Sequence, residues 1–281
     1  MTLHKAALIG DFEKCQLLIQ QNSDVNRLDR VLSRPIHCAI SSGSLEIVSL
    51  LVEHGADINI ESNQNKTPIV LACLGEYFDI FEYLLKRGAV VHNVPLYLIV
   101  EKGNLEICKL LIQNGADVHF KDHYGRTSLH YAASKSDFEI CKLLLEKDPD
   151  VSIEDANGKT PLRCILDNGG VDLFELLVKH GADLNLQNIS GKTLLHIYAS
   201  RDFQICQYLV DNGADPSIKD NDGNTPLHVA TSRLSPKSSD GGRLICKLLI
   251  ENNIDINAKN VLGMTSLHYA VLKKDLEIFS C

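Results

Sequence analysis

The chain has no long apolar run, no secretory signal and no excess of positive charge. Its 281 residues contain no stretch of roughly 18 consecutive apolar residues, the length that a membrane helix requires. Residues 1–11 lack the apolar core of a signal peptide. The net charge of -8 disfavours nucleic acid as a partner, because such binding depends on clustered Lys and Arg. We therefore expect no membrane or nucleic-acid partner, no secretion, and a location in the cytoplasm or, as the alternative, the nucleus.

Motifs of catalytic sites are also missing. The sequence contains no G-x-S-x-G, no H-E-x-x-H and no Gly-rich loop that could cradle phosphate. Many carboxylates instead recur at a fixed period, in the column Asp24, Asp57, Asp117, Asp150, Asp183, Asp215 and Asp255. Periodic placement is typical of a structural role rather than of a general acid and base. We expect no enzyme activity, no cofactor and no small-molecule substrate.

What the chain does contain is one pattern repeated about every 33 residues. Eight times a residue that tolerates a positive φ angle closes a Leu-rich stretch: Asn22, Gly55, Gly88, Gly115, Asp148, Gly181, Gly213 and Asn253. Such residues commonly follow the last turn of a helix in the left-handed conformation. A fixed period of this length predicts an array of stacked structural repeats.

A second marker recurs near the start of the repeats, in its full form a Thr followed by Leu and His. The best copies are Thr127-Ser128-Leu129-His130, Thr160-Pro161-Leu162-Arg163, Thr193-Leu194-Leu195-His196, Thr225-Pro226-Leu227-His228 and Thr265-Ser266-Leu267-His268. With this signature and length the chain resembles the ankyrin-repeat family over essentially its whole length. The resemblance implies an all-α repeat solenoid of helix-turn-helix units with projecting β-hairpin or loop fingers.

One domain, 1–281, is expected to hold nine such repeats. Their approximate bounds are 1–29, 30–62, 63–92, 93–121, 122–154, 155–187, 188–219, 220–259 and 260–281. Met1 leads almost directly into the first signature, and the chain stops at Phe279-Ser280-Cys281, before the Leu-Leu step of its last helix. Because an uncapped repeat leaves an apolar face open, we expect truncation at both ends, as a fragment of a longer protein or a truncated gene model. The alternative is a partner that covers the open face.

Six histidines share the last position of the signature: His4, His37, His130, His196, His228 and His268. Stacked repeats lie roughly 10 Å apart, so two of these rings cannot bind one metal ion at about 2 Å. The resemblance implies that each ring instead hydrogen-bonds loop backbone between adjacent repeats. We predict a structural role for all six and no metal site.

The nine cysteines show the same periodicity. Five occupy one position of the second helix: Cys15, Cys108, Cys141, Cys206 and Cys246. Sister repeats place Val48, Phe81 and Phe174 there, which indicates a core position. No C-x-x-C pair is present, so we expect reduced, buried thiols rather than a zinc site or disulfides.

Two internal departures interrupt the period. The fourth repeat is six residues short, and His92-Asn93-Val94-Pro95 replaces a full fingertip, which predicts a stunted tip. The eighth repeat carries an insertion between its two helices, residues 234–242, whose composition predicts a surface loop. Both readings remain open for the insertion: a neutral one, and a regulatory one through Ser235-Pro236.

Candidate partner-binding residues follow the His column. In repeats five to nine the next position offers Tyr131, Ile197, Val229 and Tyr269, and Arg201 and Arg233 are near in sequence. Aromatic residues and Arg are typical of binding hot spots, so this set predicts a stripe that contacts a protein partner on the concave face. Fingertip residues, Tyr124 and Arg126 among them, are further candidates. The alternative is that these side chains are ordinary packing beneath neighbouring hairpins.

Three functional classes fit the resemblance to different degrees. The favoured one is a non-enzymatic scaffold or adaptor that binds a protein partner. A substrate-recognition part of a ubiquitin ligase would need a cullin-linking box, which these residues do not contain. An ankyrin segment of a membrane-active toxin resembling the latrotoxins would be glycosylated at Asn65-Lys66-Thr67 and Asn188-Ile189-Ser190 on export, but the absent signal and nine thiols argue against it.

Overall fold

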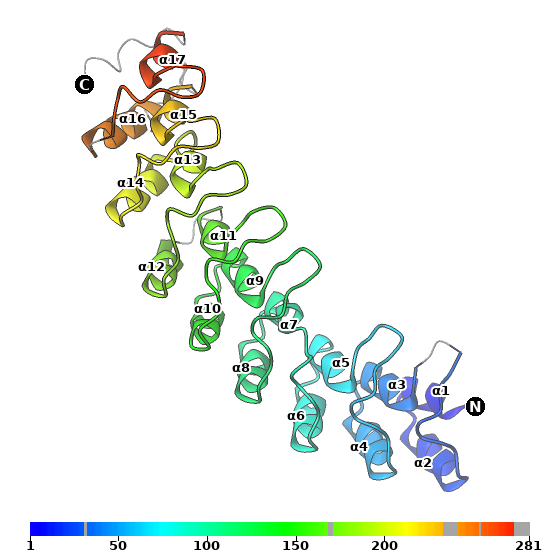
Figure 1. The fold of residues 1–281 in the computed structure, drawn as a ribbon. Coiled ribbons are helices and arrows are strands. Elements are labelled where there is room, and N and C mark those ends of the chain that lie inside the picture. The colour runs from blue at the N-terminus through cyan, green and yellow to red at the C-terminus, as the bar shows by residue number, and fades with distance from the viewer. Residues whose placement is uncertain (31–32, 168–170, 233–240, 253, 273–281) are drawn as a thin grey trace. The chain divides into compact units, whose positions relative to one another are not determined.

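Seventeen helices and no strand make up the part of the chain that the computed structural model describes, residues 1–30, 33–167, 171–232, 241–252 and 254–272 (Figure 1). The side chains of 171 and 172 are outside that description. The helices confirm the predicted all-α repeat architecture. They divide between two compact halves, Met1–Pro149 and Asp150–Cys281, called here the N-terminal and C-terminal halves.

Helices alternate between a short first helix and a longer second helix in each repeat. In the N-terminal half they are α1 (Leu3–Leu8), α2 (Phe12–Gln20), α3 (Pro35–Ser41), α4 (Leu45–Glu53), α5 (Pro68–Leu74), α6 (Phe78–Lys86), α7 (Leu96–Lys102), α8 (Leu105–Gln113), α9 (Ser128–Ser134) and α10 (Phe138–Leu145). In the C-terminal half they are α11 (Pro161–Asp167), α12 (Val171–Lys179), α13 (Leu194–Tyr198), α14 (Phe203–Asp211), α15 (Pro226–Ser232), α16 (Gly241–Glu251) and α17 (Ser266–Leu272). First helices contact first helices of the neighbouring repeat from α1 to α9 and from α13 to α17, and second helices contact second helices in the pairs α2 and α4, α4 and α6, α8 and α10, and α14 and α16.

Local chemistry sets where these helices begin and end. Several first helices start at Pro, which suits the first helical position because its missing N–H would have no partner there. Several second helices start after a capping side chain, as at Asp11, whose carboxylate accepts the Lys14 N–H at 2.9 Å. Seven of the eight predicted helix-ending residues have a positive φ, from 51° at Asp148 to 93° at Gly213, which confirms the prediction for them. Asn253 lies outside the described residues.

The second-helix position that the cysteine column occupies is part of the core, as the sequence predicted. Cys15, Cys108, Cys141 and Cys206 are fully buried, and Phe81 and Phe174 fill the same position in sister repeats. Burial raises the pKa of the Cys108, Cys141 and Cys206 thiols to about 12. Such thiols are held protonated and packed as small apolar groups.

The projecting fingers are loops rather than β-hairpins, because none of their described residues is in a strand. In repeat five the N–H of Asp122 donates to the carbonyl of Arg126 at 2.9 Å, and the Asp122 carboxylate accepts the N–H groups of Tyr124 and Arg126. These side-chain bonds use amides that a strand ladder would need. Asp155, Asn188, Asp220 and Asn260 close their own tips in the same way. We call these five the tip acceptors.

The Asp column also serves the loops. Each of its seven carboxylates accepts the backbone N–H two residues ahead, at 2.8 to 3.0 Å. This is the local turn that Asp commonly forms with its own backbone. The column is therefore part of the loop structure, as its period indicated.

The two departures from the period have different outcomes. In repeat four a single turn, with the Val94 N–H donating to the Val91 carbonyl at 3.0 Å, leads directly into α7, so the tip is short as predicted. In repeat eight the assignment of Gly241 and Gly242 to the inserted loop was wrong. Both lie in the first turn of α16, where backbone N–H groups lack helical partners in any case and Gly is tolerated. The rest of the insertion, including Ser235 and Pro236, lies in 233–240, outside the described residues.

Candidate functional site

The predicted binding residues fall into separate groups. Tyr131, with Tyr124 and Arg126, lies in the N-terminal half, whereas Ile197, Arg201, Val229 and Tyr269 lie in the C-terminal half. Arg233 is outside the described residues. Tyr131, Ile197, Val229 and Tyr269 are all half-buried, which agrees with neither full packing nor full exposure.

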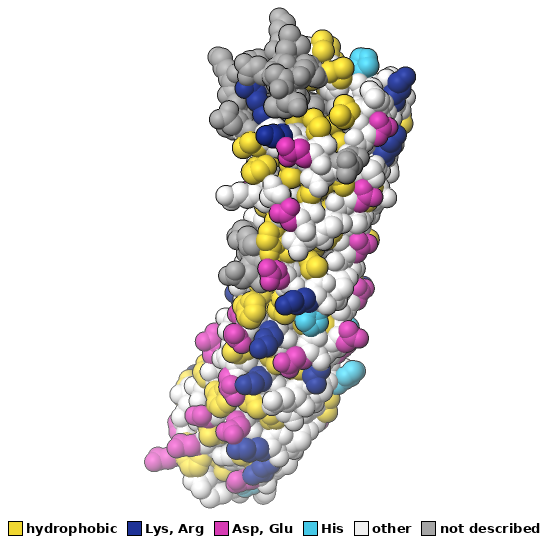
Figure 2. Space-filling view, turned by 90° about the vertical axis from the view of Figure 1, so that its left-hand side faces the viewer, with side chains coloured by type: hydrophobic (Ala, Val, Ile, Leu, Met, Phe, Trp, Pro, Cys, Tyr) yellow, Lys and Arg dark blue, Asp and Glu magenta, His cyan; other side chains and the backbone are white. Residues whose placement is uncertain are grey.

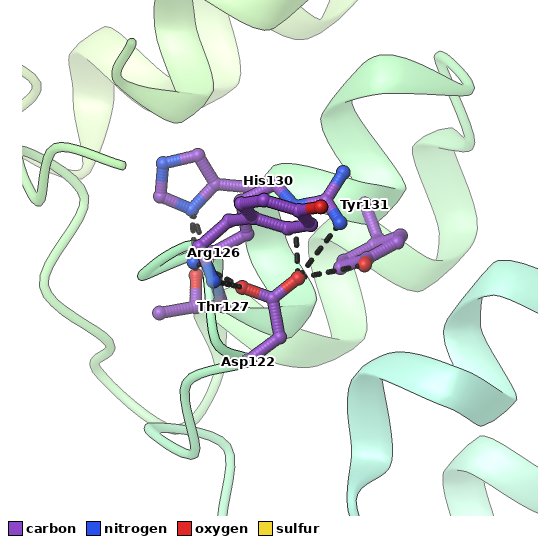
Figure 3. A network of polar contacts seen from close by, with 6 residues as sticks. Asp122, Arg126, Thr127, His130 and Tyr131 are labelled. Carbon is purple, nitrogen blue, oxygen red and sulfur yellow. Dashed lines mark hydrogen bonds and ion pairs between the residues drawn. The ribbon is translucent and has the colours of Figure 1, made fainter. Parts of the chain in front are cut away.

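In the N-terminal half, Tyr131 belongs to a closed polar network around the buried carboxylate of Asp122 (Figure 3). The Tyr131 hydroxyl donates to Asp122 Oδ2 at 2.9 Å, and Arg126 Nε donates to the same oxygen at 2.9 Å. The Arg126 guanidinium lies 4.6 Å from the centre of the Tyr131 ring and 5.0 Å from that of Tyr124. The ring of Tyr97 stacks on the ring of Tyr131, and the two ring centres are 5.5 Å apart. The charge of Arg126 is thus paired with a buried carboxylate.

The titration of these groups agrees with that geometry. Burial raises the pKa of Tyr131 to about 12, and its hydrogen bond to Asp122 acts in the same direction. Burial alone would raise the pKa of Asp122, but the hydrogen bonds from Arg126 and Tyr131 outweigh it and lower that pKa. The network therefore stays in one charge state near neutral pH, as a structural ion pair does.

In the C-terminal half, Ile197, Arg201 and Val229 converge on one cavity of about 500 Å³. The other lining residues are Arg163 of α11, Asn188 and Lys192 of a loop tip, His196 of α13, and Ser200 after α13. Among the described residues, the lining thus holds three cations and no carboxylate. Glu154 and Asp183 line a smaller adjoining hollow of about 20 Å³, which shares Arg163 and Lys192.

None of the three cationic groups is paired within the described residues. No hydrogen bond or ion pair of that part of the chain involves the guanidinium groups of Arg163 and Arg201 or the ammonium of Lys192. The Nε atom of Arg163 is buried without an acceptor. A buried donor left without a partner is destabilising, and groups of this kind are uncommon in folded proteins. This arrangement contrasts with the paired Arg126.

Arg163, Asn188 and Ser200 were not predicted as site residues. Arg163 carried a visible signal, since it stands at the His position of its signature and introduces a permanent charge where other repeats hold imidazole. Asn188 also carried one, because it replaces the Asp found at the tips of repeats five, six and eight. Its amide oxygen accepts the same two backbone N–H groups, at 3.0 Å each, without bringing a negative charge.

Tyr269 is not among the lining residues of the cavity and instead packs against residues of repeats eight and nine. Asn260 donates to the Tyr269 hydroxyl at 3.0 Å, and the Tyr269 ring meets His228 edge-on at 6.2 Å. This contact fits the alternative of ordinary packing better than the binding stripe. Its role in binding stays an untested prediction.

The His column shows a common contact pattern. The Nδ1 atoms of His37, His130, His196, His228 and His268 accept the backbone N–H three residues before them, at 3.1 to 3.2 Å. The Nε2 atoms of His4, His37, His196 and His228 lie 2.8 to 3.1 Å from carbonyls of Arg27, Ile60, Asn224 and Met264 in the loops that lead to the next repeat. Because Nδ1 accepts where both contacts occur, the hydrogen-bond network assigns the proton to Nε2, which donates. The structural role of the column stays a prediction that unfolding experiments can test.

Stability is expected to fall as the pH drops below about 6.5. Burial lowers the pKa of His37, His196 and His228, although their bonds to carbonyls act in the opposite direction. In the unfolded chain the same rings bind a proton near pH 6.5, so below that pH the unfolded state holds more protons and the free energy of unfolding decreases. The loss is complete once the pH passes below the lowered values of the folded state. Urea titrations at about pH 7.5 and about pH 5.5, followed by circular dichroism, measure it.

A His196→Gln variant provides the control for this prediction. It should be less stable than wild type at neutral pH but lose less stability on acidification, since one titrating ring is gone. Equal stability of the wild type at the two pH values would contradict the prediction. If the variant loses as much stability on acidification as the wild type, His196 does not contribute to the pH dependence.

Loop tips in the C-terminal half are bonded to one another. The N–H of Asn221 donates to the Ser190 carbonyl at 3.1 Å, and the N–H of Val261 donates to the Asp222 carbonyl at 3.0 Å. Exposed apolar side chains stand on these tips, with Ile189 89% and Leu262 77% exposed. This linked set of tips, 188–192, 220–224 and 260–264, lies in the same half as the cavity and shares Asn188 and Lys192 with it.

On the face shown in Figure 2, acidic and basic side chains are interspersed. Among the described residues, no group of three His, Cys, Asp or Glu side chains is placed to hold a metal ion. Over the same residues no helix has the length and apolar character needed to cross a bilayer.

Comparison with known proteins gives one broad and one narrow similarity. A family model described as ankyrin repeats (3 copies) matches residues 3–94, 96–188, 164–260 and 195–280. Over 40 residues the chain is 48% identical to the apicidin F cluster transcription factor apf2 of Gibberella fujikuroi, a match that covers 14% of this chain and 10% of that protein. The narrow match extends over little more than one repeat.

Proposed function

Because the chain belongs to the ankyrin-repeat family, whose members generally mediate protein–protein interaction, we propose that it is a non-enzymatic scaffold that binds a protein partner through its C-terminal half. The observation that carries this proposal is the convergence of Ile197, Arg201 and Val229 on one cavity. Apolar side chains beside an unpaired Arg are the composition typical of interface hot spots. The linked loop tips extend this surface with exposed Ile189 and Leu262.

The corresponding residues of the N-terminal half support this choice by contrast. Arg126 and Tyr131 already bond Asp122, so a partner would have to compete with that network for their polar groups. Arg201 is exposed, and its guanidinium has no such bond within the described residues. A new contact with Arg201 would therefore replace only water.

The test is affinity capture from native lysate with wild type and an Ile197→Ala, Arg201→Ala double variant, read by mass spectrometry. Partners retained by wild type should be lost by the double variant, because truncating hot-spot residues typically weakens binding by more than about 1 kcal/mol each. Lys247→Ala is the matched control, since Lys247 is exposed on α16 of the same half, away from the cavity. Circular dichroism confirms that each variant is folded. Identical captures from wild type and a folded double variant would refute the proposed surface.

A further inference from the structure

The residues that line the cavity of the C-terminal half differ in their charge pairing from equivalent residues of the neighbouring repeats. Repeats five, six and seven place a basic residue four positions after the tip acceptor: Arg126, Lys159 and Lys192. In repeat five that cation bonds the tip acceptor itself, with Arg126 Nη2 2.8 Å from Asp122 Oδ2. In repeat six, Lys159 Nζ lies 2.7 Å from Asp167 Oδ2.

Repeat seven breaks this scheme at both possible partners. Asn188 closes the tip with its amide oxygen, as Asp122 does with a carboxylate, so the loop keeps its geometry while the negative charge is lost. Ser200 stands where Asp167 supplies the carboxylate that pairs with Lys159 in repeat six. Lys192 therefore lines the cavity without an ion pair in the described part of the chain.

Arg163 adds a second charge by replacing a neutral ring. At the same signature position the neighbouring His196 is held neutral, since burial lowers its pKa. A guanidinium stays protonated in proteins, so Arg163 brings a permanent charge into the cavity wall. Its Nε has no acceptor among the residues that the structure describes, and the exposed Arg201 supplies a third charge.

We propose that this cavity binds an acidic segment of a protein partner, with an Asp or Glu carboxylate seated among Arg163, Lys192 and Arg201. The proposal rests on the proposed function and names the partner chemistry at that surface. Charge complementarity carries it, because three cations that have no ion pair among the described residues gather in a chain whose net charge is -8. A volume of about 500 Å³ leaves room for side chains rather than for a single ion. Ile197 and Val229 supply the apolar wall against which the methylene groups of the acidic side chain pack.

The test measures binding of a fluorescein-labelled hexaglutamate peptide to the full chain by fluorescence anisotropy. Wild type should bind saturably, and Lys192→Ala should weaken binding about tenfold or more, as expected when a charge-assisted hydrogen bond is lost. Lys247→Ala removes the same charge outside the cavity and should leave the affinity within about twofold. Asn188→Asp should also weaken binding about tenfold or more, because it restores the carboxylate that pairs with the basic residue in repeat five while keeping the tip acceptor.

Several outcomes would overturn the proposal. These are absence of saturable binding by wild type, equal weakening by Lys192→Ala and Lys247→Ala, and unchanged binding by a folded Asn188→Asp variant. Displacement of the peptide by hexaglutamine as effectively as by unlabelled hexaglutamate would show that the carboxylates are not recognised. Displacement by inorganic phosphate at matching concentration would assign the cavity to phosphate instead. If the peptide fails to bind while captured partners are still lost from the Ile197→Ala, Arg201→Ala variant, the proposed function stands and only the acidic segment is refuted.

Discussion

Replacing Phe174 by Ala is expected to lower the free energy of unfolding of the C-terminal half by about 3–5 kcal/mol. Phe174 is fully buried in α12. Its ring meets that of Tyr208 edge-on at 4.6 Å, and Tyr208 belongs to α14 of the next repeat. The truncation therefore leaves a void and also removes an aromatic contact between two adjacent repeats.

Denaturant titration of both proteins, followed by tyrosine fluorescence because the chain has no Trp, measures the change. Native-state hydrogen exchange, read by mass spectrometry on peptides from 171–214, places it in the C-terminal half. Phe174→Leu should cost distinctly less, since most of the volume is retained. Ile189→Ala is the control, because that side chain is 89% exposed and its removal should change stability by no more than about 0.5 kcal/mol. Loss of less than about 1 kcal/mol on Phe174→Ala would contradict the packing described for α12 and α14.

The second large effect is expected at a loop tip. Gly191→Ala should destabilise the C-terminal half by about 2–4 kcal/mol. Gly191 has a φ of 72°, a conformation that side chains with a Cβ atom adopt at a cost, and the added Cβ would lie 2.6 Å from the Asn221 backbone nitrogen. Neither the Asn221 N–H nor the tip it belongs to can move away without losing the bond to Ser190.

Gly213→Ala separates backbone strain from steric overlap. Gly213 has a φ of 93°, but an added Cβ would meet nothing within 4 Å. Its substitution should therefore cost only the strain, about 1–2 kcal/mol. Thermal unfolding of the two variants gives the comparison. Equal losses of stability for Gly191→Ala and Gly213→Ala would mean that the tips that hold Gly191 and Asn221 are not in close contact in solution.

Much of the fold could be predicted from the sequence because most contacts of an ankyrin repeat are formed within the repeat or with an adjacent one. The residues that end helices, the Cys column and the Asp column are all placed by contacts within one repeat or with its neighbour, so the period shows them directly. The strand content of the fingers could not be settled in that way. The outcome depends on whether the side chains of Asp122 and its equivalents accept hydrogen bonds from the backbone N–H groups of the tips, and they do.

The candidate site was predicted less well, and charge pairing is the reason. Column alignment placed Tyr131 and Ile197 at equivalent positions, but it could not show that Tyr131 and Arg126 share the carboxylate of Asp122. It also could not show that Arg163 and Lys192 line one cavity, since their side chains come from a helix and from the tip of the next repeat. Which side chains form ion pairs depends on their positions in the folded protein. The effect of Asn188 in place of Asp can therefore be seen only together with the position of the nearby cation.

The bonds between neighbouring loop tips have a consequence for how fast and how tightly a partner can bind. A free loop must be ordered when a partner contacts it, and the lost conformational entropy weakens the complex. Here Asn221 and Val261 already fix their tips to the adjacent loops through backbone hydrogen bonds. If the proposed partner contacts these tips, we expect it to meet loops that are already ordered, so that association would be limited by encounter and orientation rather than by loop closure.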